Sequence, residues 1–185
     1  KPTFNNLASV RGCVKLNLGK IEEALRSFDE AKVWGADHPN VDLLHGLALE
    51  KRGQSLKNPT ERKAMLVDSL RRYNSCLQRH GTVYTEETLL GATSWLSWTR
   101  AGIVLTLLGE YEDAKTAFKT AIRLNGNYNN AQFGLAEVTI RSGDPSKGLQ
   151  MLQSLLTDES PDAWIIASMA CERLGLVDNL PTFMA

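Results

Sequence analysis

The residue types that most often carry catalysis or bind metal ions are scarce in this sequence. It has three cysteines and three histidines: Cys13, Cys76, Cys171, His38, His45 and His80. None of them shows the C-x2-C or H-x3-H spacing of a zinc site, and three distant cysteines do not indicate a disulfide framework. We therefore predict that the protein binds no metal ion and that its thiols are reduced and buried.

One pair of these residues could do chemistry if the fold brought it together. A thiol beside an imidazole can form a thiolate nucleophile, and Cys13 with His45 is the candidate pair. The sequence has no G-x-S-x-G motif, no phosphate-binding glycine loop, no H-E-x-x-H motif and no calcium loop. We predict that the protein is not an enzyme and needs no cofactor, and that His45 is a partly buried polar residue.

The elements that would position such residues are marked by glycines. Five of them end successive stretches of helix-patterned sequence: Gly19, Gly53, Gly109, Gly143 and Gly175. Two of the intervals are 34 residues long, and a period of this length is typical of helical repeats that bury their apolar faces against each other. Turn-forming clusters separate the stretches and no alternating strand pattern lies between them, so the sequence predicts an all-α fold.

Other residues recur at fixed distances from these glycines. Seven positions earlier stands a small residue each time: Gly12, Gly46, Gly102, Ala136 and Ser168. The best copy of the full pattern consists of Trp98, Ala101, Gly102, Leu105, Gly109, Tyr111, Ala114, Phe118 and Ala121. This copy resembles the tetratricopeptide repeat, a helix-turn-helix unit of about 34 residues.

The resemblance implies both a fold and a class of function. It implies a right-handed superhelix of antiparallel helix pairs in a single domain, residues 1–185, with four units and a partial fifth. The expected units are residues 5–38, 39–83, 95–128, 129–160 and 161–185, with a helical insertion within 54–94. Because members of this family bind other proteins or peptides, we expect a non-enzymatic scaffold or adaptor.

The second unit is longer than the others. The interval from Gly53 to the next glycine of the series is 56 residues, which is 34 plus 22, so two insertions of eleven residues fit. Eleven residues make about three helical turns and can lengthen a helix without rotating its apolar face. We predict two long helices, Thr60 to Arg79 and Thr85 to Leu108, each opened by a threonine followed by glutamate. The alternative is that residues 54–58 and 81–84 are longer loops.

The binding surface follows from the resemblance as well. In the family the first helix of each unit lines a concave groove, through positions thirteen, ten, six, three and two residues before the turn glycine. The candidate binding residues are Ser9, Cys13, Leu43, Leu47, Leu96, Thr99, Ile103, Phe133, Glu137 and Arg141. Members that bind the C-terminal carboxylate of heat-shock chaperones use a set of Lys, Asn and Arg that is missing here. We expect an apolar groove for an extended or helical segment, part of which the inserted helices could cover.

A second candidate surface is the basic helix of the second unit. Between residues 60 and 80 five basic residues outnumber two acidic ones: Arg62, Lys63, Arg71, Arg72 and Arg79. Such a helix can bind an acidic partner or a nucleic-acid backbone, although it is more often a solvated face. Tyr73 is better explained as the core aromatic of the repeat than as a platform for stacking bases. The alternative function is therefore a nucleic-acid-associated helical-repeat module.

Composition limits the remaining classes. The 185 residues are 43% hydrophobic, and 21 basic residues balance 21 acidic ones, which argues against nucleic acid or an anionic membrane as the main partner. No run of apolar residues is long enough for membrane insertion. The reduced thiols favour a cytoplasmic protein. Because the chain begins at Lys1 and its fifth unit is incomplete, we also expect a homo-oligomer or a part of a larger chain or complex.

Overall fold

Antiparallel helix pairs stacked in chain order make up the structure. The computed structural model describes residues 7–81, 89–156, 172 and 175, and these ranges contain eight helices and no strand. The helices are α1 (Leu7–Asn17), α2 (Ile21–Val33), α3 (Pro39–Ser55), α4 (Pro59–Leu77), α5 (Trp95–Leu108), α6 (Tyr111–Leu124), α7 (Asn129–Arg141) and α8 (Pro145–Leu156). The all-α repeat fold is thus confirmed. The predicted partial unit at 161–185 lies outside the described residues, apart from Glu172 and Gly175.

Within the first three pairs, an aromatic ring of the second helix packs on a glycine of the first. A Cβ atom added to any of these glycines would lie 2.7 or 2.8 Å from the ring, closer than two carbon atoms can approach. The pairs are Gly12 with Phe28, Gly46 with Tyr73, and Gly102 with Phe118. The small residue seven positions before the turn glycine therefore sets the spacing of the two helices.

The turn glycines are confirmed at three of the four places where a described helix pair meets. Gly19, Gly109 and Gly143 have φ values of 71°, 84° and 103°, a left-handed conformation that glycine adopts without a steric penalty. The prediction for Gly53 is wrong. This residue lies inside α3, which continues to Ser55, and it packs there against the side chain of Leu66.

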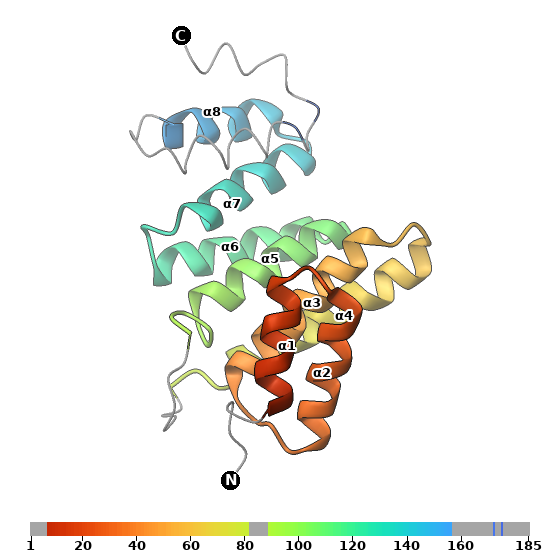
Figure 1. The fold of residues 1–185 in the computed structure, drawn as a ribbon. Coiled ribbons are helices and arrows are strands. Elements are labelled where there is room, and N and C mark those ends of the chain that lie inside the picture. Colours follow the sequence, from red (N-terminus) through yellow and green to blue (C-terminus); the bar gives the residue numbers. More distant parts are fainter. Residues whose placement is uncertain (1–6, 82–88, 157–171, 173–174, 176–185) are drawn as a thin grey trace.

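The first eleven-residue insertion lengthens both helices of the second pair. α3 has 17 residues and α4 has 19, whereas the other helices have 11 to 14. Asn58 caps α4 by accepting hydrogen bonds from the backbone N–H groups of Thr60 and Glu61. The long helix predicted from Thr60 is thus confirmed within two residues at each end. The joined ends of α3 and α4 project from the side of the stack (Figure 1).

The second insertion does not lengthen a helix, so the prediction of one helix from Thr85 to Leu108 is wrong. Residues 90–94 form turns and α5 begins only at Trp95. Gly91 has a φ of 79°, which interrupts a helix, and its carbonyl accepts the N–H of Leu96. The predicted start at Thr85 lies outside the described residues. Beyond it, the N–H of Leu89 donates to the side chain of Asn40, so this connection packs against the start of α3.

The outer face of α1 is apolar and exposed. Leu7 and Val14 are 79% and 51% exposed, whereas the residues 34 positions later, Val41 and Ala48, are fully buried with α2. α1 therefore presents the kind of surface that stacks between units elsewhere in the chain. None of the helices in the described ranges is both long and apolar enough to span a lipid bilayer.

Stacking between units predicts the effect of one substitution. A Cβ atom on Gly134 of α7 would lie 2.3 Å from the buried ring of Phe118. Alanine is a better helix former than glycine by up to about 1 kcal/mol, but the clash reverses this gain. We expect Gly134→Ala to lower the free energy of unfolding by about 1 to 3 kcal/mol in urea denaturation.

Gly126 is the matched control, because a Cβ atom there would meet only a backbone oxygen at 3.8 Å. Gly126→Ala should leave the unfolding free energy within about 0.5 kcal/mol of the original. Equal stability of the two variants would show that α6 and α7 do not pack as closely as described.

Candidate functional site

A groove of about 700 Å³ runs across the first helices of all four pairs. It is lined mainly by the C-terminal halves of α1, α3, α5 and α7. Four residues that the sequence predicted for partner binding lie in it: Leu47, Ile103, Glu137 and Arg141. Leu16 and Leu107 add apolar surface, so side chains from four separate helices meet along one continuous depression.

The other predicted binding residues do not line this groove. Ser9, Leu43, Thr99 and Phe133 are core residues, each less than 5% exposed. The remaining two are half-buried and pack against core clusters: Cys13 against the cluster that contains Phe28, and Leu96 against the cluster that contains Tyr73. The four buried positions lie ten residues before the turn glycine, or its equivalent, where the side chains point between neighbouring pairs. Of the five positions expected from the family, those six, three and two residues before it supply the groove residues, although Cys13 at the first of these does not line the groove.

A buried carboxylate forms part of the groove wall. Glu50 is 3% exposed and accepts a hydrogen bond of 2.7 Å from the hydroxyl of Tyr73. Its other oxygen accepts a bond of 3.3 Å from Gln54 and lies 3.5 Å from Arg100. Burial raises the pKa of Glu50, which the cation of Arg100 opposes. Burial and the neighbouring Glu50 also raise the pKa of Tyr73 well above its usual value, so its hydroxyl remains a donor.

Sequence reasoning missed some of the groove residues. Arg100 lies three residues before Ile103 on α5, and helical spacing could have placed both side chains on one face. Phe118 and Gly134 line the groove although they belong to the stacking contact. Nothing in the sequence could have shown this, because it depends on how α6 and α7 pack around the buried ring.

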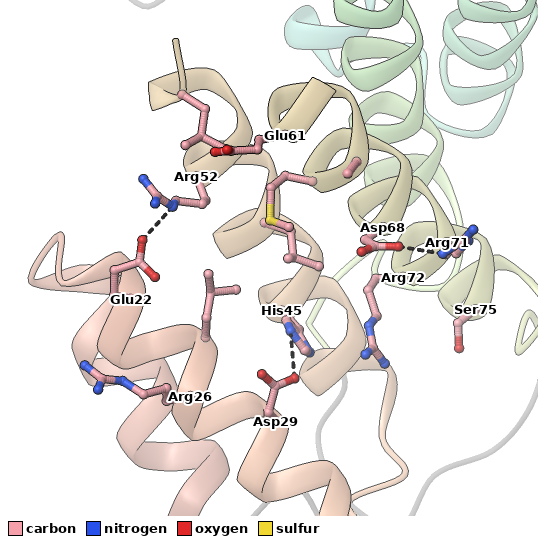
Figure 2. A pocket seen from close by; sticks show the side chains of 15 residues that line it. Glu22, Arg26, Asp29, His45, Arg52, Glu61, Asp68, Arg71, Arg72 and Ser75 are labelled. Atoms are coloured by element: carbon pink, nitrogen blue, oxygen red, sulfur yellow. Dashed lines mark hydrogen bonds and ion pairs between the residues drawn. The ribbon is translucent and has the colours of Figure 1, made fainter. Parts of the chain in front are cut away.

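A larger cleft of about 1120 Å³ lies between α2 and α4, with α3 at its base (Figure 2). Four basic and four acidic side chains line it: Arg26, Arg52, Arg71, Arg72, Glu22, Asp29, Glu61 and Asp68. Arg52 pairs with Glu22 at 2.5 Å, and Arg71 pairs with Asp68 at 2.6 Å. Because the charges balance and many are paired, the cleft has no net charge that would select a partner.

Beside this cleft, Asp42 is a fully buried carboxylate that connects three elements. Its oxygens lie 2.8 Å from Lys32 of α2, 3.4 Å from Arg72 of α4 and 3.1 Å from Arg79. Ser75 donates a further hydrogen bond of 3.1 Å. The carboxylate therefore ties the second helix of the first pair to the second pair.

Three of the five residues of the predicted basic surface form ion pairs with carboxylates. Arg71 pairs with Asp68, Arg72 with Asp42, and Arg79 with both Asp37 and Asp42. The two remaining residues of the set, Arg62 and Lys63, lie near the start of α4, and Lys63 is exposed. Two of the five cations, Arg72 and Arg79, are thus tied to the buried Asp42, whereas the side chain of Arg71 is 74% exposed.

Neither cysteine in the described residues has the environment of a nucleophile. Burial raises the pKa of Cys13, and burial together with Asp42 raises that of Cys76 to about 12. Both side chains therefore stay as thiols at neutral pH. Across the described ranges, no group of three or more His, Cys, Asp or Glu side chains is arranged to hold a metal ion.

His45 is more buried than expected. It is 2% exposed and stacks on Phe28, with 5.7 Å between the ring centroids. Its Nε2 atom lies 3.5 Å from Asp29 (Figure 2), and Nδ1 is buried with no hydrogen-bond partner among the described residues. Burial, with a smaller contribution from Arg72, lowers its pKa from 6.5 to about 4. The imidazole is therefore neutral at physiological pH.

Comparison with known proteins shows which family one repeat resembles and which known structures share the fold. A sequence model of the tetratricopeptide repeat matches residues 97–128, which span most of α5 and all of α6. Solved tetratricopeptide structures match nearly the whole stack. Residues 97–128 thus match one tetratricopeptide repeat, and the stack as a whole has the fold of tetratricopeptide proteins. No curated protein sequence matches it.

Three of the similar solved structures show how far the likeness extends. TTC0263, a thermophilic tetratricopeptide protein of Thermus thermophilus, has a TM-score of 0.68 at 17% identity, covering 86% of this chain and 77% of its own. For MamA the TM-score is 0.64 at 17% identity, with 96% and 86% covered. For YrrB, a tetratricopeptide protein with an unusual peptide-binding site, it is 0.53 at 17% identity, with 89% and 75% covered. At this identity the likeness shows the fold.

The ion pairs around Asp42 predict a large effect on stability. Asp42→Asn removes a buried negative charge that contacts three cations. We expect a loss of about 3 to 5 kcal/mol in the free energy of unfolding, measured by urea denaturation. The control is Asp68→Asn, because the side chain of Asp68 is 44% exposed. This variant should lower the free energy of unfolding by less than about 1 kcal/mol. Similar losses in both variants would contradict the arrangement.

The buried imidazole predicts a pH dependence. Because the pKa of His45 is lower in the folded chain, about 4, than its ordinary 6.5, protonation favours the unfolded state. Its stabilising effect is complete above pH 6.5 and is lost as the pH falls toward 4. Between these limits the original protein should lose up to about 3 kcal/mol more than His45→Gln. Urea denaturation of both proteins at several pH values measures this difference, and parallel pH profiles would exclude a buried, neutral His45.

Proposed function

We propose that this chain is a non-enzymatic protein-interaction module that holds an extended or helical segment of a partner protein in the groove across α1, α3, α5 and α7. The observation that carries the proposal is that four successive first helices contribute to one groove of about 700 Å³. Leu47, Ile103 and Leu107 line it while remaining only half-buried. Apolar side chains left partly open in a concave surface are typical of peptide recognition.

The likeness to solved structures supports a module of this kind. Tetratricopeptide folds are generally scaffolds, and one similar protein, YrrB, has a peptide-binding site. The alternative function in nucleic-acid binding finds less support, because three of the five predicted basic residues are paired with carboxylates. A groove that combines apolar side chains with a few charged ones should bind with a much weaker dependence on salt than a surface that binds a phosphate backbone.

The test is selection from a random-sequence peptide display library, followed by fluorescence anisotropy with the selected peptides. Leu47→Glu combined with Ile103→Glu places two charges on the apolar surface of the groove. We expect the affinity to fall by at least about tenfold, because each charge would have to be desolvated on binding. Circular dichroism should show that the helices remain.

The control variant carries the same charges elsewhere. Val33 and Leu124 are 84% and 44% exposed and neither lines the groove, so Val33→Glu combined with Leu124→Glu should leave the affinity unchanged. If both double variants bind the selected peptides as tightly as the original protein, the groove is not the binding site. Binding of nucleic acid with a steep salt dependence would favour the alternative.

A further inference from the structure

The charged side chains of the groove are arranged by sign. The two carboxylates are recessed: the side chains of Glu50 and Glu137 are 4% and 14% exposed. The cations lie further out, because the side chains of Arg100 and Arg141 are 32% and 31% exposed and Lys51 is exposed. A ligand entering the groove therefore meets positive charge first, although the whole chain has a formal net charge of zero.

The recessed carboxylates already have hydrogen-bond or ion-pair partners within the chain. Both oxygens of Glu50 accept hydrogen bonds, one from Tyr73 at 2.7 Å and the other from Gln54 at 3.3 Å. Glu137 pairs with Arg141 at 3.1 Å. A basic ligand would have to displace these partners, and a buried carboxylate that loses its partner is strongly destabilised. The groove is thus poorly suited to a positively charged ligand.

Arg100 and Lys51 have N–H donors that are not used in hydrogen bonds among the described residues. A guanidinium has five N–H donors, and the contact of Arg100 with Glu50 is a single one at 3.5 Å, longer than an ordinary hydrogen bond. Across the described residues no other hydrogen bond or ion pair of Arg100 is found, and none of Lys51. Glu50 is itself fixed by the fully buried Tyr73. It therefore acts as a positioning residue, which holds Arg100 in the groove without using most of its donors.

Apolar surface separates the cations. Leu47, Ile103 and Leu107 line the same groove as Lys51 and Arg100. Resting on the proposed function, we infer that the groove selects acidic peptide segments, in which aspartate or glutamate side chains stand among apolar residues. The carboxylates of the ligand bind Arg100 and Lys51, and its apolar residues cover the leucines and isoleucine. Charge-assisted hydrogen bonds of this kind are the stronger class, and they give orientation as well as affinity.

The experiment uses the peptides selected from the random-sequence library against the whole chain. Among peptides whose binding is lost on Leu47→Glu, we expect aspartate and glutamate to be enriched over the unselected library. Replacing these acidic residues by asparagine and glutamine should weaken binding by about tenfold in anisotropy. Lys51→Gln should weaken the binding of the acidic peptide by a similar factor. It should leave unchanged the binding of the peptide in which asparagine and glutamine replace the acidic residues.

Two further variants control for structural effects. Lys63→Gln removes an exposed cation of α4 that does not line the groove, and it should not change the affinity. Arg100→Gln could disturb the fold, because Glu50 would lose its cation, so thermal unfolding is measured beside it and Arg100→Lys is expected to restore part of the affinity. If Arg100→Gln is destabilised, the affinity of Lys51→Gln for the acidic peptide decides whether the groove selects acidic segments.

The outcomes separate this inference from the proposed function. Peptides that depend on Leu47 but are not enriched in acidic residues would overturn the selectivity and leave the groove as the binding site. An affinity that Lys51→Gln does not change would do the same. A library that yields no peptide dependent on Leu47 would overturn both proposals.

Discussion

The stack depends on the close approach of an aromatic ring to the backbone of a neighbouring helix. Phe118 illustrates this, because its ring lies against Gly102 of its own pair and Gly134 of the next. A side chain at either glycine would push two helices apart. The same residue thus sets the spacing within one unit and between two, and the apolar area that it buries stabilises both contacts. The shape of the groove follows from this spacing, since Phe118 and Gly134 also line it.

The second pair adds an electrostatic constraint to this packing. Beside the cleft between α2 and α4, the buried Asp42 of α3 joins these helices through its three cations. A buried carboxylate with several partners is weak evidence for added stability but fixes how the partners are placed. Here it fixes α2 relative to α3 and α4. Arg72 and Arg79, two of the five basic residues predicted to form an interaction surface, serve this structural purpose.

In the groove, burial and charge act together. Glu50 is held in the wall by Tyr73, a residue whose ring also packs against Gly46 to join α3 and α4. One hydrogen bond, from Tyr73 to Glu50, therefore connects the core of the second pair to the binding surface. Because the carboxylate is recessed and Arg100 is not, the surface offered to a partner is more positive than the residue count alone suggests.

The sequence by itself determined the helical repeat, the three turn glycines, and the glycines on which the rings pack, since each of these depends on a local conformation or on a residue's size. Leu47, Ile103, Glu137 and Arg141 followed from the resemblance to the repeat family, which assigns their positions to the concave face. Tertiary structure decided the rest. Gly53 could continue a helix because an extended partner helix brought Leu66 against it, whereas Gly91 ended one. Ser9 and Thr99, which were predicted to line the groove, are buried in the core. Their burial depends on neighbours that are distant in the chain, and local spacing cannot predict it.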